Sequence, residues 1–294
     1  MDIKNFAVIK GNVITQHGLI TYKAGNSGDA WATVRSNISF NNGTIEFAAN
    51  IKSHNTGINL AMNSFGNQKV RIGCSRTTSK FSIRIEDEVW RSLSKAGSLN
   101  NYEFNKDIFF KIHIEGSLIK LFINDIFFCE ANLSTKESPI EFSLISDADF
   151  TLHNIKLTTS TPKLFVVMQF SSEYNELYNE VIKPVSEKLR FDCIRGDEFY
   201  AGTPILLDIT KSIKEATAII AEITPDNPNV FYEIGYSHAI EKPTILLCDK
   251  RRANLPFDLS SFRTLYYENT IAGKKKIEIN LTKYLENIKS SSNS

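Results

Sequence analysis

The sequence predicts two domains, an all-β sandwich followed by an α/β domain with a parallel sheet. The chain has 294 residues, of which 42% are hydrophobic, so it is long and apolar enough for two cores. Residues 1–159 consist of short alternating runs, whereas residues 160–294 alternate continuous apolar runs with helical patterns. The polar stretch "TTSTP" (158–162) separates the two rhythms, and we place the domain boundary there.

The first domain is predicted from runs of period two, in which alternate side chains are apolar. Such runs recur about every 8 to 12 residues and are separated by Gly, Asn and Ser. Clear examples are 43–51, 109–116 and 118–125, with hairpin turns expected at 115–117 and 124–125. About a dozen such strands with almost no helix indicate a two-sheet sandwich of the jelly-roll type.

The end of this half resembles the concanavalin-A-like, laminin-G-like sandwich family. The resemblance lies in "GSLIKLFINDIFF" (116–128), similar to a hairpin of that family, and in "FTLHNIKL" (150–157), similar to its closing strand. It implies a recognition or assembly domain that responds to a glycan or protein trigger. Trp31 and Trp90 are candidates for stacking on a sugar, although packing is the more common role of a tryptophan. No carboxylate pair has a spacing that favours glycoside hydrolysis.

The second domain is predicted from strands that alternate with helices, the pattern of a parallel α/β sheet. The five predicted strands are 163–170, 191–194, 217–223, 243–248 and 264–268. Four helices are predicted. The first covers 174–189, and the second begins at Thr203 and Pro204 and ends at about 215. The third is capped by Asn227, and the fourth covers 277–288. Five such units suit the flavodoxin-like strand order 2-1-3-4-5.

In that order the loops after strands one and three open into one crevice, where ligands bind. Glu233 falls about six residues into the helix that follows strand three, one to two turns from this rim. A helix glutamate is most often a solvated surface residue. Its apolar neighbours Tyr232 and Ile234, its place near the crevice and the following Gly235 favour a functional role here. A glycine inside a helix suggests the close approach of a neighbouring group.

Composition and motifs exclude several other classes. The net charge of +1 argues against nucleic acid and membrane surfaces as partners. The chain has no apolar run of about 18 residues and no signal-peptide pattern, so we expect a cytoplasmic protein. The four cysteines form no C-x-x-C pair and are expected to be buried free thiols, not zinc ligands. "GYSHA" (235–239) places its serine inside a helix, unlike a hydrolase nucleophile elbow, and there is no phosphate-binding glycine loop.

Residues 163–288 resemble the nucleoside 2-deoxyribosyltransferase-like group, which shares its fold and chemistry with TIR domains. The resemblance lies in "KLFVVMQF" (163–170), "IIAEIT" (219–224) and "NPNVFYEIGYSHAIEKPTILL" (227–247). It implies that Glu233 attacks, or stabilises charge at, the anomeric carbon of a ribose or deoxyribose. Two positions depart from the family pattern: Glu222 replaces a substrate-contacting aspartate, and His238 is bulkier than in many relatives.

The resemblance implies an N-glycosidase that cleaves the base–(deoxy)ribose bond of a nucleotide such as NAD, as an effector in bacterial antiviral defence. The alternatives are a deoxynucleotide N-hydrolase or deoxyribosyltransferase, and a non-catalytic nucleotide-sensing module. We expect no bound cofactor or metal, NAD as a possible substrate, and a homo-oligomer. With Glu233 as the catalytic residue, the predicted substrate-binding residues are Gln169, Phe170, Ser171, Ser172, Asp197, Glu222, Thr224, Asp226, Asn229 and Tyr232.

Overall fold

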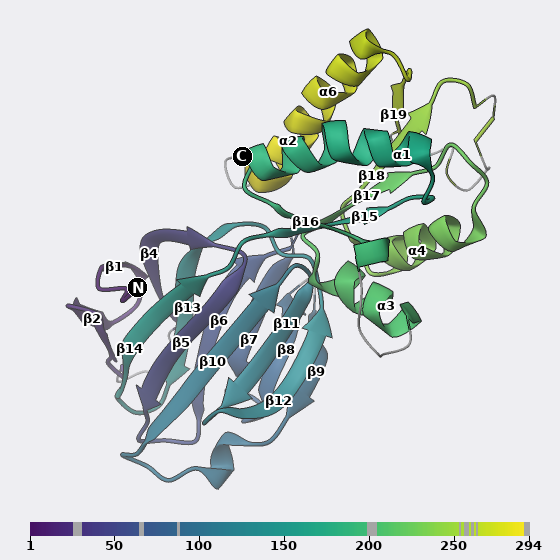
Figure 1. Ribbon diagram of the computed structural model, residues 1–294. Coiled ribbons are helices and arrows are strands. Elements are labelled where there is room, and N and C mark those ends of the chain that lie inside the picture. The colour runs from purple at the N-terminus through teal and green to yellow at the C-terminus, as the bar shows by residue number, and fades with distance from the viewer. Residues whose placement is uncertain are drawn as a thin grey trace. The chain divides into compact units, whose positions relative to one another are not determined.

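The structure is a computed structural model that describes residues 1–25, 31–64, 68–86, 89–198, 205–252, 254–255, 259, 262 and 264–290. The chain divides into two compact units, Met1–Ser160 and Thr161–Ser294. Figure 1 shows the strands of the first unit and the helices and strands of the second. Within the described ranges no helix combines the length and the apolar character needed to span a bilayer.

The first unit consists of two seven-stranded antiparallel sheets. In spatial order the first sheet contains β1 (Phe6–Lys10), β4 (Ala32–Phe40), β13 (Ser138–Ser146), β6 (Thr56–Asn63), β7 (Lys69–Cys74), β8 (Phe81–Glu86) and β9 (Trp90–Ala96). The second contains β12 (Ile126–Asn132), β11 (Leu118–Ile123), β10 (Asp107–Glu115), β5 (Gly43–Asn50), β14 (Phe150–Thr159), β3 (Leu19–Tyr22) and β2 (Val13–Gln16). The predicted β-sandwich is therefore confirmed, whereas the jelly-roll subtype stays a prediction.

The predicted hairpins of this unit are also found, and local backbone geometry explains their turns. β10 pairs with β11, and β11 pairs with β12, both antiparallel. Asn124 and Asp125 have φ angles of 51° and 61°, the left-handed pair that a two-residue type I′ turn requires. Gly116, with φ 60°, closes the other hairpin without the steric penalty that a side chain would add.

The core of the sandwich lies between the two sheets and contains packed aromatic rings. Phe47 stacks on Phe110 of the same sheet with ring centroids 4.8 Å apart. Phe142, from the opposite sheet, meets Phe47 edge-on at 5.0 Å. Such offset and edge-to-face pairs contribute beyond the burial of their area. The apolar positions of the alternating runs thus form one core, as their period predicted.

The second unit contains a parallel sheet of five strands. Their spatial order is β16 (Asp192–Arg195), β15 (Lys163–Val167), β17 (Ala218–Glu222), β18 (Thr244–Asp249) and β19 (Thr264–Tyr267). All four neighbouring pairs are parallel. This is the predicted order 2-1-3-4-5, and it places the carboxyl ends of β15 and β17 side by side.

Helices cover both faces of this sheet (Figure 1). They are α1 (Ser172–Leu177), the π turn η2 (Tyr178–Ile182), α2 (Lys183–Lys188), α3 (Ile205–Glu215), α4 (Pro228–Ala239) and α6 (Ile271–Ser290). The short η3 (Gly196–Glu198) follows β16, and the short η1 (Leu99–Asn101) belongs to the first unit. The closing helix begins six residues before the predicted position 277. The predicted Thr203–Pro204 start of α3 lies outside the described residues.

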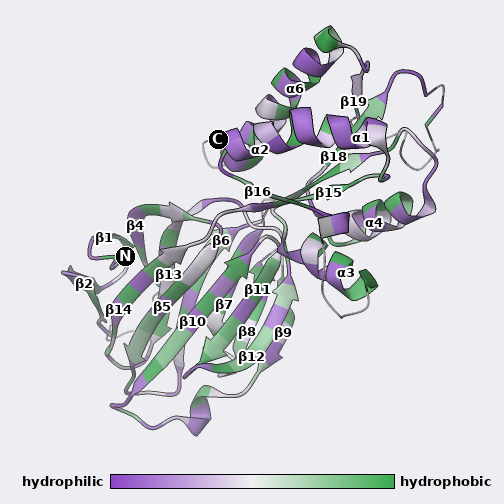
Figure 2. Ribbon diagram, viewed as in Figure 1, coloured by the Kyte–Doolittle hydropathy of each residue, from purple (hydrophilic) through white to green (hydrophobic). Residues whose placement is uncertain are grey.

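The strands of the second unit are buried on both sides, as their continuous apolar runs predicted. On β17, Ala218 and Ile220 pack into one cluster with side chains of α1, α2 and α6. Ile219 and Ala221 pack into another with side chains of α3 and α4. Figure 2 shows hydrophobic residues on these strands, whereas the helices carry both hydrophobic and hydrophilic residues. Alternate residues of β17 therefore serve opposite faces of the sheet.

The cysteines and tryptophans can also be placed. Cys74, Cys129 and Cys248 are buried free thiols as predicted, whereas Cys193 is half-buried. Trp31 and Trp90 are 38% and 48% exposed, so neither is a core residue. The guanidinium of Arg84 lies 5.0 Å from the ring centre of Trp90 and occupies one face of it.

Candidate functional site

A cavity of about 590 Å³ opens at the carboxyl ends of β15 and β16, on the face of the sheet that α3 and α4 cover. This volume lies within the usual range of small-molecule sites, about 300–1,000 Å³. The lining is mostly apolar and contains a few polar groups. The lining residues are Val166, Val167, Met168, Gln169, Phe170, Gly196, Asp197, Ile205, Leu206, Ile209, Asn227, Asn229, Val230, Tyr232 and Glu233.

Helix α4 places Glu233 on the wall of this cavity. Asn227 caps the helix as predicted, because its side chain accepts a hydrogen bond of 3.0 Å from the backbone N–H of Asn229. Pro228 occupies the first turn, where its missing N–H costs nothing. Glu233 follows in the second turn. Gly235 is exposed, and a Cβ there would have no neighbour within 4 Å, so the predicted close approach at this glycine is wrong.

The Glu233 carboxyl group is half-buried and has no protein partner among the described residues. Burial raises its pKa to about 7, because a low-dielectric environment disfavours the charged form. A hydrogen-bond donor or a cation would lower this pKa, and none of the described side chains does so. The carboxylate is therefore free to interact with a ligand in the cavity.

Five of the predicted substrate-binding residues line the same cavity. These are Gln169, Phe170, Asp197, Asn229 and Tyr232. Two of them are aromatic side chains that remain about half exposed, Phe170 at 55% and Tyr232 at 51%. An aromatic ring that is exposed beside a cavity offers a flat apolar surface to a flat ligand. Topology thus brings together residues that are up to 63 positions apart in the chain.

Sequence reasoning missed Arg195, which lies beside this cavity at the end of β16. Its side chain is buried and donates to both carboxylate oxygens of Asp197, at 2.6 and 2.5 Å, and to Asn175 at 2.8 Å. Its guanidinium also lies 4.4 Å from the ring centre of Tyr178 and 5.5 Å from that of Phe170. The sequence feature that could have identified Arg195 is its position as a basic residue at the carboxyl end of the second strand, directly before Gly196. Asp197 is therefore held in an ion pair.

The other predicted residues do not line the cavity. Ser171 is the N-cap residue of α1 but makes no capping bond with its side chain, and Ser172 is exposed. The Asp226 carboxylate pairs with Arg252 at 2.5 Å. Arg252 also donates to the backbone oxygen of Thr224 at 2.8 Å, so it fixes the loop between β17 and α4.

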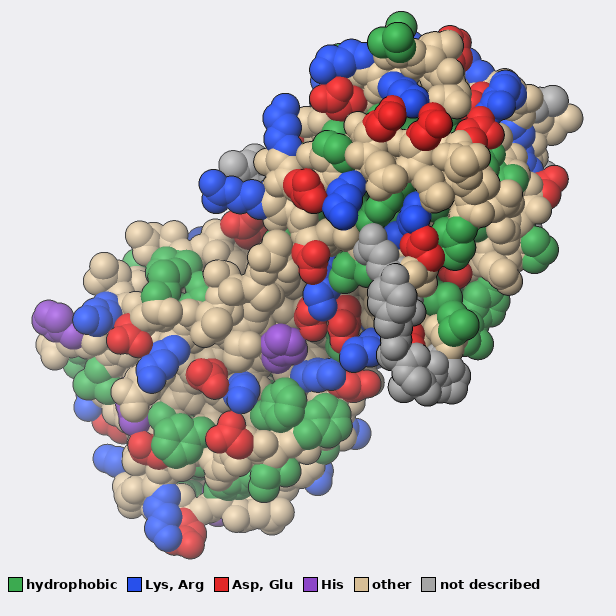
Figure 3. All heavy atoms as spheres, viewed as in Figure 1, with side chains coloured by type: hydrophobic (Ala, Val, Ile, Leu, Met, Phe, Trp, Pro, Cys, Tyr) green, Lys and Arg blue, Asp and Glu red, His purple; other side chains and the backbone are tan. Residues whose placement is uncertain are grey.

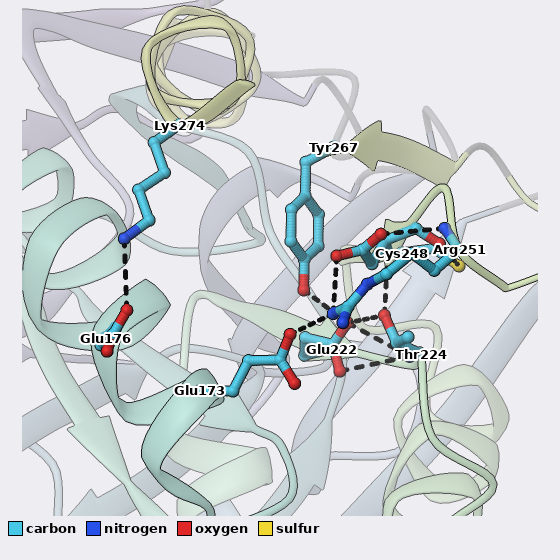
Figure 4. Close-up of polar contacts among 9 residues, drawn as sticks. Glu173, Glu176, Glu222, Thr224, Cys248, Arg251, Tyr267 and Lys274 are labelled. Carbon is cyan, nitrogen blue, oxygen red and sulfur yellow. Dashed lines mark hydrogen bonds and ion pairs between the residues drawn. The ribbon is translucent and has the colours of Figure 1, made fainter. Parts of the chain in front are cut away.

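Glu222 and Thr224 belong to a second polar cluster, on the opposite face of the sheet (Figure 4). Glu222 is fully buried, and its carboxylate accepts hydrogen bonds from the Thr224 hydroxyl, from the Thr224 N–H at 3.2 Å, and from the Tyr267 hydroxyl at 3.0 Å. Burial raises the pKa of Glu222 to about 7, although the Thr224 and Tyr267 donors act in the opposite direction. Glu222 therefore faces Tyr267 on β19 and is separated from the cavity by the sheet.

Loop residues after β18 extend this cluster to α1. Asp249 is buried, and Arg251 pairs with it at 2.9 Å. Arg251 also forms an ion pair with Glu173 of α1. The Thr224 hydroxyl accepts a hydrogen bond of 2.8 Å from the Asp249 N–H, which links the ends of β17 and β18. Glu222, Thr224 and Tyr267 are thus hydrogen-bonded to one another, which indicates a structural role, whereas Oδ2 of Asp249 is buried with an ion-pair contact to Arg251 and no hydrogen bond.

The described residues contain no group of three or more His, Cys, Asp or Glu side chains arranged to hold a metal ion. The residues that line the cavity can instead hold an organic ligand, with one free carboxylate, three amides and two aromatic rings.

Comparison with known proteins gives a limited result. No protein-family model and no curated protein matches the chain. Among solved structures, a carbohydrate binding module from Bacillus subtilis is similar over 54% of this chain and 98% of its own, with 14% identity and a TM-score of 0.42. Bacillus licheniformis β-glucanase is similar over 53% of this chain and 92% of its own, with 11% identity and a TM-score of 0.40. A Bacillus subtilis protein of unknown function with a galectin-like fold is similar over 53% and 90%, with 9% identity and a TM-score of 0.42.

These likenesses concern the fold of the N-terminal half, and at such scores they say nothing about a ligand of this chain. The sandwich itself is established by the pairing of its strands. The nucleoside 2-deoxyribosyltransferase-like assignment of the C-terminal half stays a prediction.

Proposed function

We propose that the C-terminal unit is an N-glycosidase that cleaves the bond between a base and the ribose of a nucleotide, with Glu233 as the catalytic residue. The observation that supports it most directly is the free, half-buried Glu233 carboxyl group on the wall of a 590 Å³ cavity. The sequence resemblance of the segment around Glu233 agrees with this proposal. The cavity also lies outside the carboxyl ends of the strands, where ligands of open parallel sheets bind.

The proposed chemistry follows from the charge of the transition state. As the C–N bond breaks, its electron pair leaves with the base, and positive charge develops at the anomeric carbon. A Glu233 carboxylate beside that carbon stabilises the charge or captures the carbon as an ester, which water then hydrolyses. Because the pKa of Glu233 is raised to about 7, its ionised form is present above that pH. We therefore expect kcat to rise with pH through about 7.

The same residues favour a leaving group that already has a positive charge. A neutral base must be protonated as it departs, which requires a second acid in the cavity. The other carboxyl group of the described lining, Asp197, is held by Arg195 through two hydrogen bonds. A pyridinium ring needs no acid, because it departs as a neutral molecule. NAD, in which nicotinamide is such a ring, is therefore the substrate that we propose, in preference to a deoxynucleotide.

The test is incubation with NAD and with a panel of deoxynucleotides, followed by detection of nicotinamide or free base. Glu233→Gln keeps the size of the side chain and removes its charge. We expect it to lower kcat by about a hundredfold or more, as loss of a group that stabilises developing charge does. Glu241→Gln, an exposed glutamate just after α4, is the matched control and should retain activity. Equal release of base by the wild type and Glu233→Gln would refute the proposal.

Two alternatives remain for the same cavity. Release of base from a deoxynucleotide, or its exchange for another base, would identify a deoxynucleotide N-hydrolase or a deoxyribosyltransferase. A non-catalytic sensor is favoured by one observation: Glu222, at the position of the family's substrate-contacting aspartate, is bound to Thr224 and Tyr267 and not to the cavity. Calorimetry that shows nucleotide binding without turnover would support the sensor.

We further propose that the protein is a homo-oligomer whose sandwich responds to a glycan or protein trigger. Helix α3 supports assembly, because Leu207 is 61% exposed and lies next to Ile205 and Leu206, which line the cavity and are still 71% and 52% exposed. Figure 3 shows such hydrophobic side chains on the surface in the region of α3. Light scattering beside an activity titration tests this proposal, and activity per protomer should rise with protein concentration. A monomer with constant activity per protomer would contradict it, and a glycan array tests the trigger.

A further inference from the structure

The side chain of Lys242 carries a buried amine that the proposed chemistry does not use. Lys242 lies between α4 and β18 and is 4% exposed. Lysine is almost never buried to this extent unless its amine has partners. Here the amine donates to the backbone oxygen of Lys214 at 2.9 Å and to that of Ala216. Both acceptors lie where α3 ends and β17 is about to begin.

These bonds cap the C-terminus of α3 from outside that helix. The last carbonyl groups of a helix have no partner within it, and a cation there also interacts favourably with the helix dipole. Lys242 supplies the donors, and its protonated form also supplies the charge. A helix end that is held by another element in this way cannot shift without breaking both of these hydrogen bonds.

The backbone of Lys242 is fixed at the same time to the end of α4. Its N–H donates to the Ser237 oxygen at 2.9 Å, and the Glu241 N–H donates to the His238 oxygen at 3.0 Å. With Glu241 in the left-handed region at φ 54°, this pair of bonds forms a Schellman motif. The hydroxyl of buried Ser237 donates in turn to the backbone oxygen of Glu233 at 2.7 Å. Lys242 is thus connected to the turn of α4 that contains the carboxylate.

Helices α3 and α4 form two walls of the same cavity. Ile205, Leu206 and Ile209 of α3 line it, together with Val230 and Glu233 of α4. Lys242 joins the ends of these helices and is not among the residues that line the cavity.

We propose that Lys242 is a positioning residue that sets the spacing between α3 and α4 and thereby keeps water away from the Glu233 carboxylate. It acts through the two helices and touches no ligand. The inference extends the proposed function, but its first measurement does not depend on activity.

The decisive variant is Lys242→Met, which keeps an unbranched apolar stem and removes the donors. The matched control is Lys211→Met, because Lys211 lies on α3 and its side chain is 69% exposed. Lys242→Arg, which retains charge and donors, is the rescue variant. If Lys242→Met does not fold, Lys242→Gln replaces it, since its amide is too short to reach both carbonyl groups. Circular dichroism at 222 nm verifies the fold of each variant.

The first readout is the pKa of Glu233, measured by ¹³C NMR titration of its carboxyl carbon and assigned with Glu233→Gln. If the walls separate, water reaches the carboxylate, and its pKa should fall by about one unit toward that of a free glutamate. A general loss of stability would not change this value in the folded protein. The second readout is steady-state kinetics with NAD, where we expect KM to rise about tenfold and kcat to change less, as loss of substrate positioning before the chemical step predicts.

The outcomes separate the two proposals. A folded Lys242→Met protein with the wild-type Glu233 pKa would overturn the positioning role, whatever the activity. A lowered Glu233 pKa in Lys242→Met, with Lys211→Met unchanged and Lys242→Arg closer to the wild type, would support it. If the wild type cleaves no nucleotide but Glu233 responds in this way, the proposed function fails and the positioning role of Lys242 stands.

Discussion

Replacement of Glu222 by glutamine should remove a pH-dependent instability of the C-terminal unit. Glu222 is fully buried, and its pKa is about 7 in the folded chain against 4.5 for a free glutamate. The folded protein therefore binds a proton that the unfolded chain has already released between these two values. The stability that the neutral carboxyl group contributes is fully present below about pH 4.5 and is lost as the pH rises through about 7.

The size of the effect follows from the two pKa values. Burial disfavours the ionised form by about 3 kcal/mol, and linkage gives a loss of about 2–3 kcal/mol between about pH 5 and about pH 8. The glutamine side chain introduced by Glu222→Gln does not ionise in this range, and its amide oxygen can accept the hydrogen bonds that Thr224 and Tyr267 now donate. The free energy of unfolding of Glu222→Gln, relative to the wild type, should therefore increase by about 2–3 kcal/mol from about pH 5 to about pH 8.

The assay must report on the correct unit. Trp31 and Trp90 both lie in the sandwich, so tryptophan fluorescence follows that unit, whereas the α-helices lie in the C-terminal unit. Urea unfolding followed by circular dichroism at 222 nm isolates the relevant transition. Glu286→Gln, at an exposed glutamate on α6, is the control. If the free energies of unfolding of the wild type and Glu222→Gln differ by the same amount at both pH values, the reasoning is refuted. Glu222 would then ionise in the folded chain as it does in water.

Three further predictions concern the same unit. Glu241→Gly should stabilise it by about 0.5–1 kcal/mol in chemical unfolding, because Glu241 occupies the left-handed position of the Schellman motif at φ 54°, and an unchanged midpoint would contradict this. Tyr267→Phe should raise the pKa of Glu222 further, as followed by carboxyl NMR, because it removes a 3.0 Å donor to the ionised form. In the wild type, burial lowers the pKa of Lys242 from 10.5 to about 7. Between these two pH values the unfolded chain binds a proton that the folded chain has released, so the free energy of unfolding should rise with pH across this range. Lys242→Met should flatten this slope.

Much of the fold could be predicted because it depends on local patterns. Period-two runs fixed which strand faces are buried, and the pair Asn124-Asp125 marked a hairpin turn that the backbone confirms. In the second unit, continuous apolar runs identified strands buried on both sides, and Asn227-Pro228 marked the start of α4. The start of α6 was missed by six residues, because Ile271 is almost fully exposed and gives no amphipathic signal there.

The candidate site was predicted in part, because proximity in the fold is not the same as orientation. Strand order alone indicated that the loops after β15 and β17 would meet, and Gln169 and Asn229 do line one cavity. The partners of each charge depend on tertiary contacts between distant segments, which no spacing reveals. Arg252 lies 26 positions from Asp226 and holds its carboxylate. Arg195 was overlooked because it occupies the end of a four-residue strand without any motif around it.

The location of Glu222 follows from the alternation of a β-strand rather than from its extra methylene group. Ile219, Ala221 and Ile223 pack toward α3 and α4, so a residue at position 222 must point to the opposite face. An aspartate at this position would also point away from the cavity. In this chain, any ligand beside Glu233 is therefore recognised by the ends of β15 and β16 and by α3 and α4, and position 222 affects it only through the loop that Thr224 anchors. Glu222→Gln should accordingly change stability with pH while leaving the affinity of the cavity for its ligand unchanged, which calorimetry with NAD can measure.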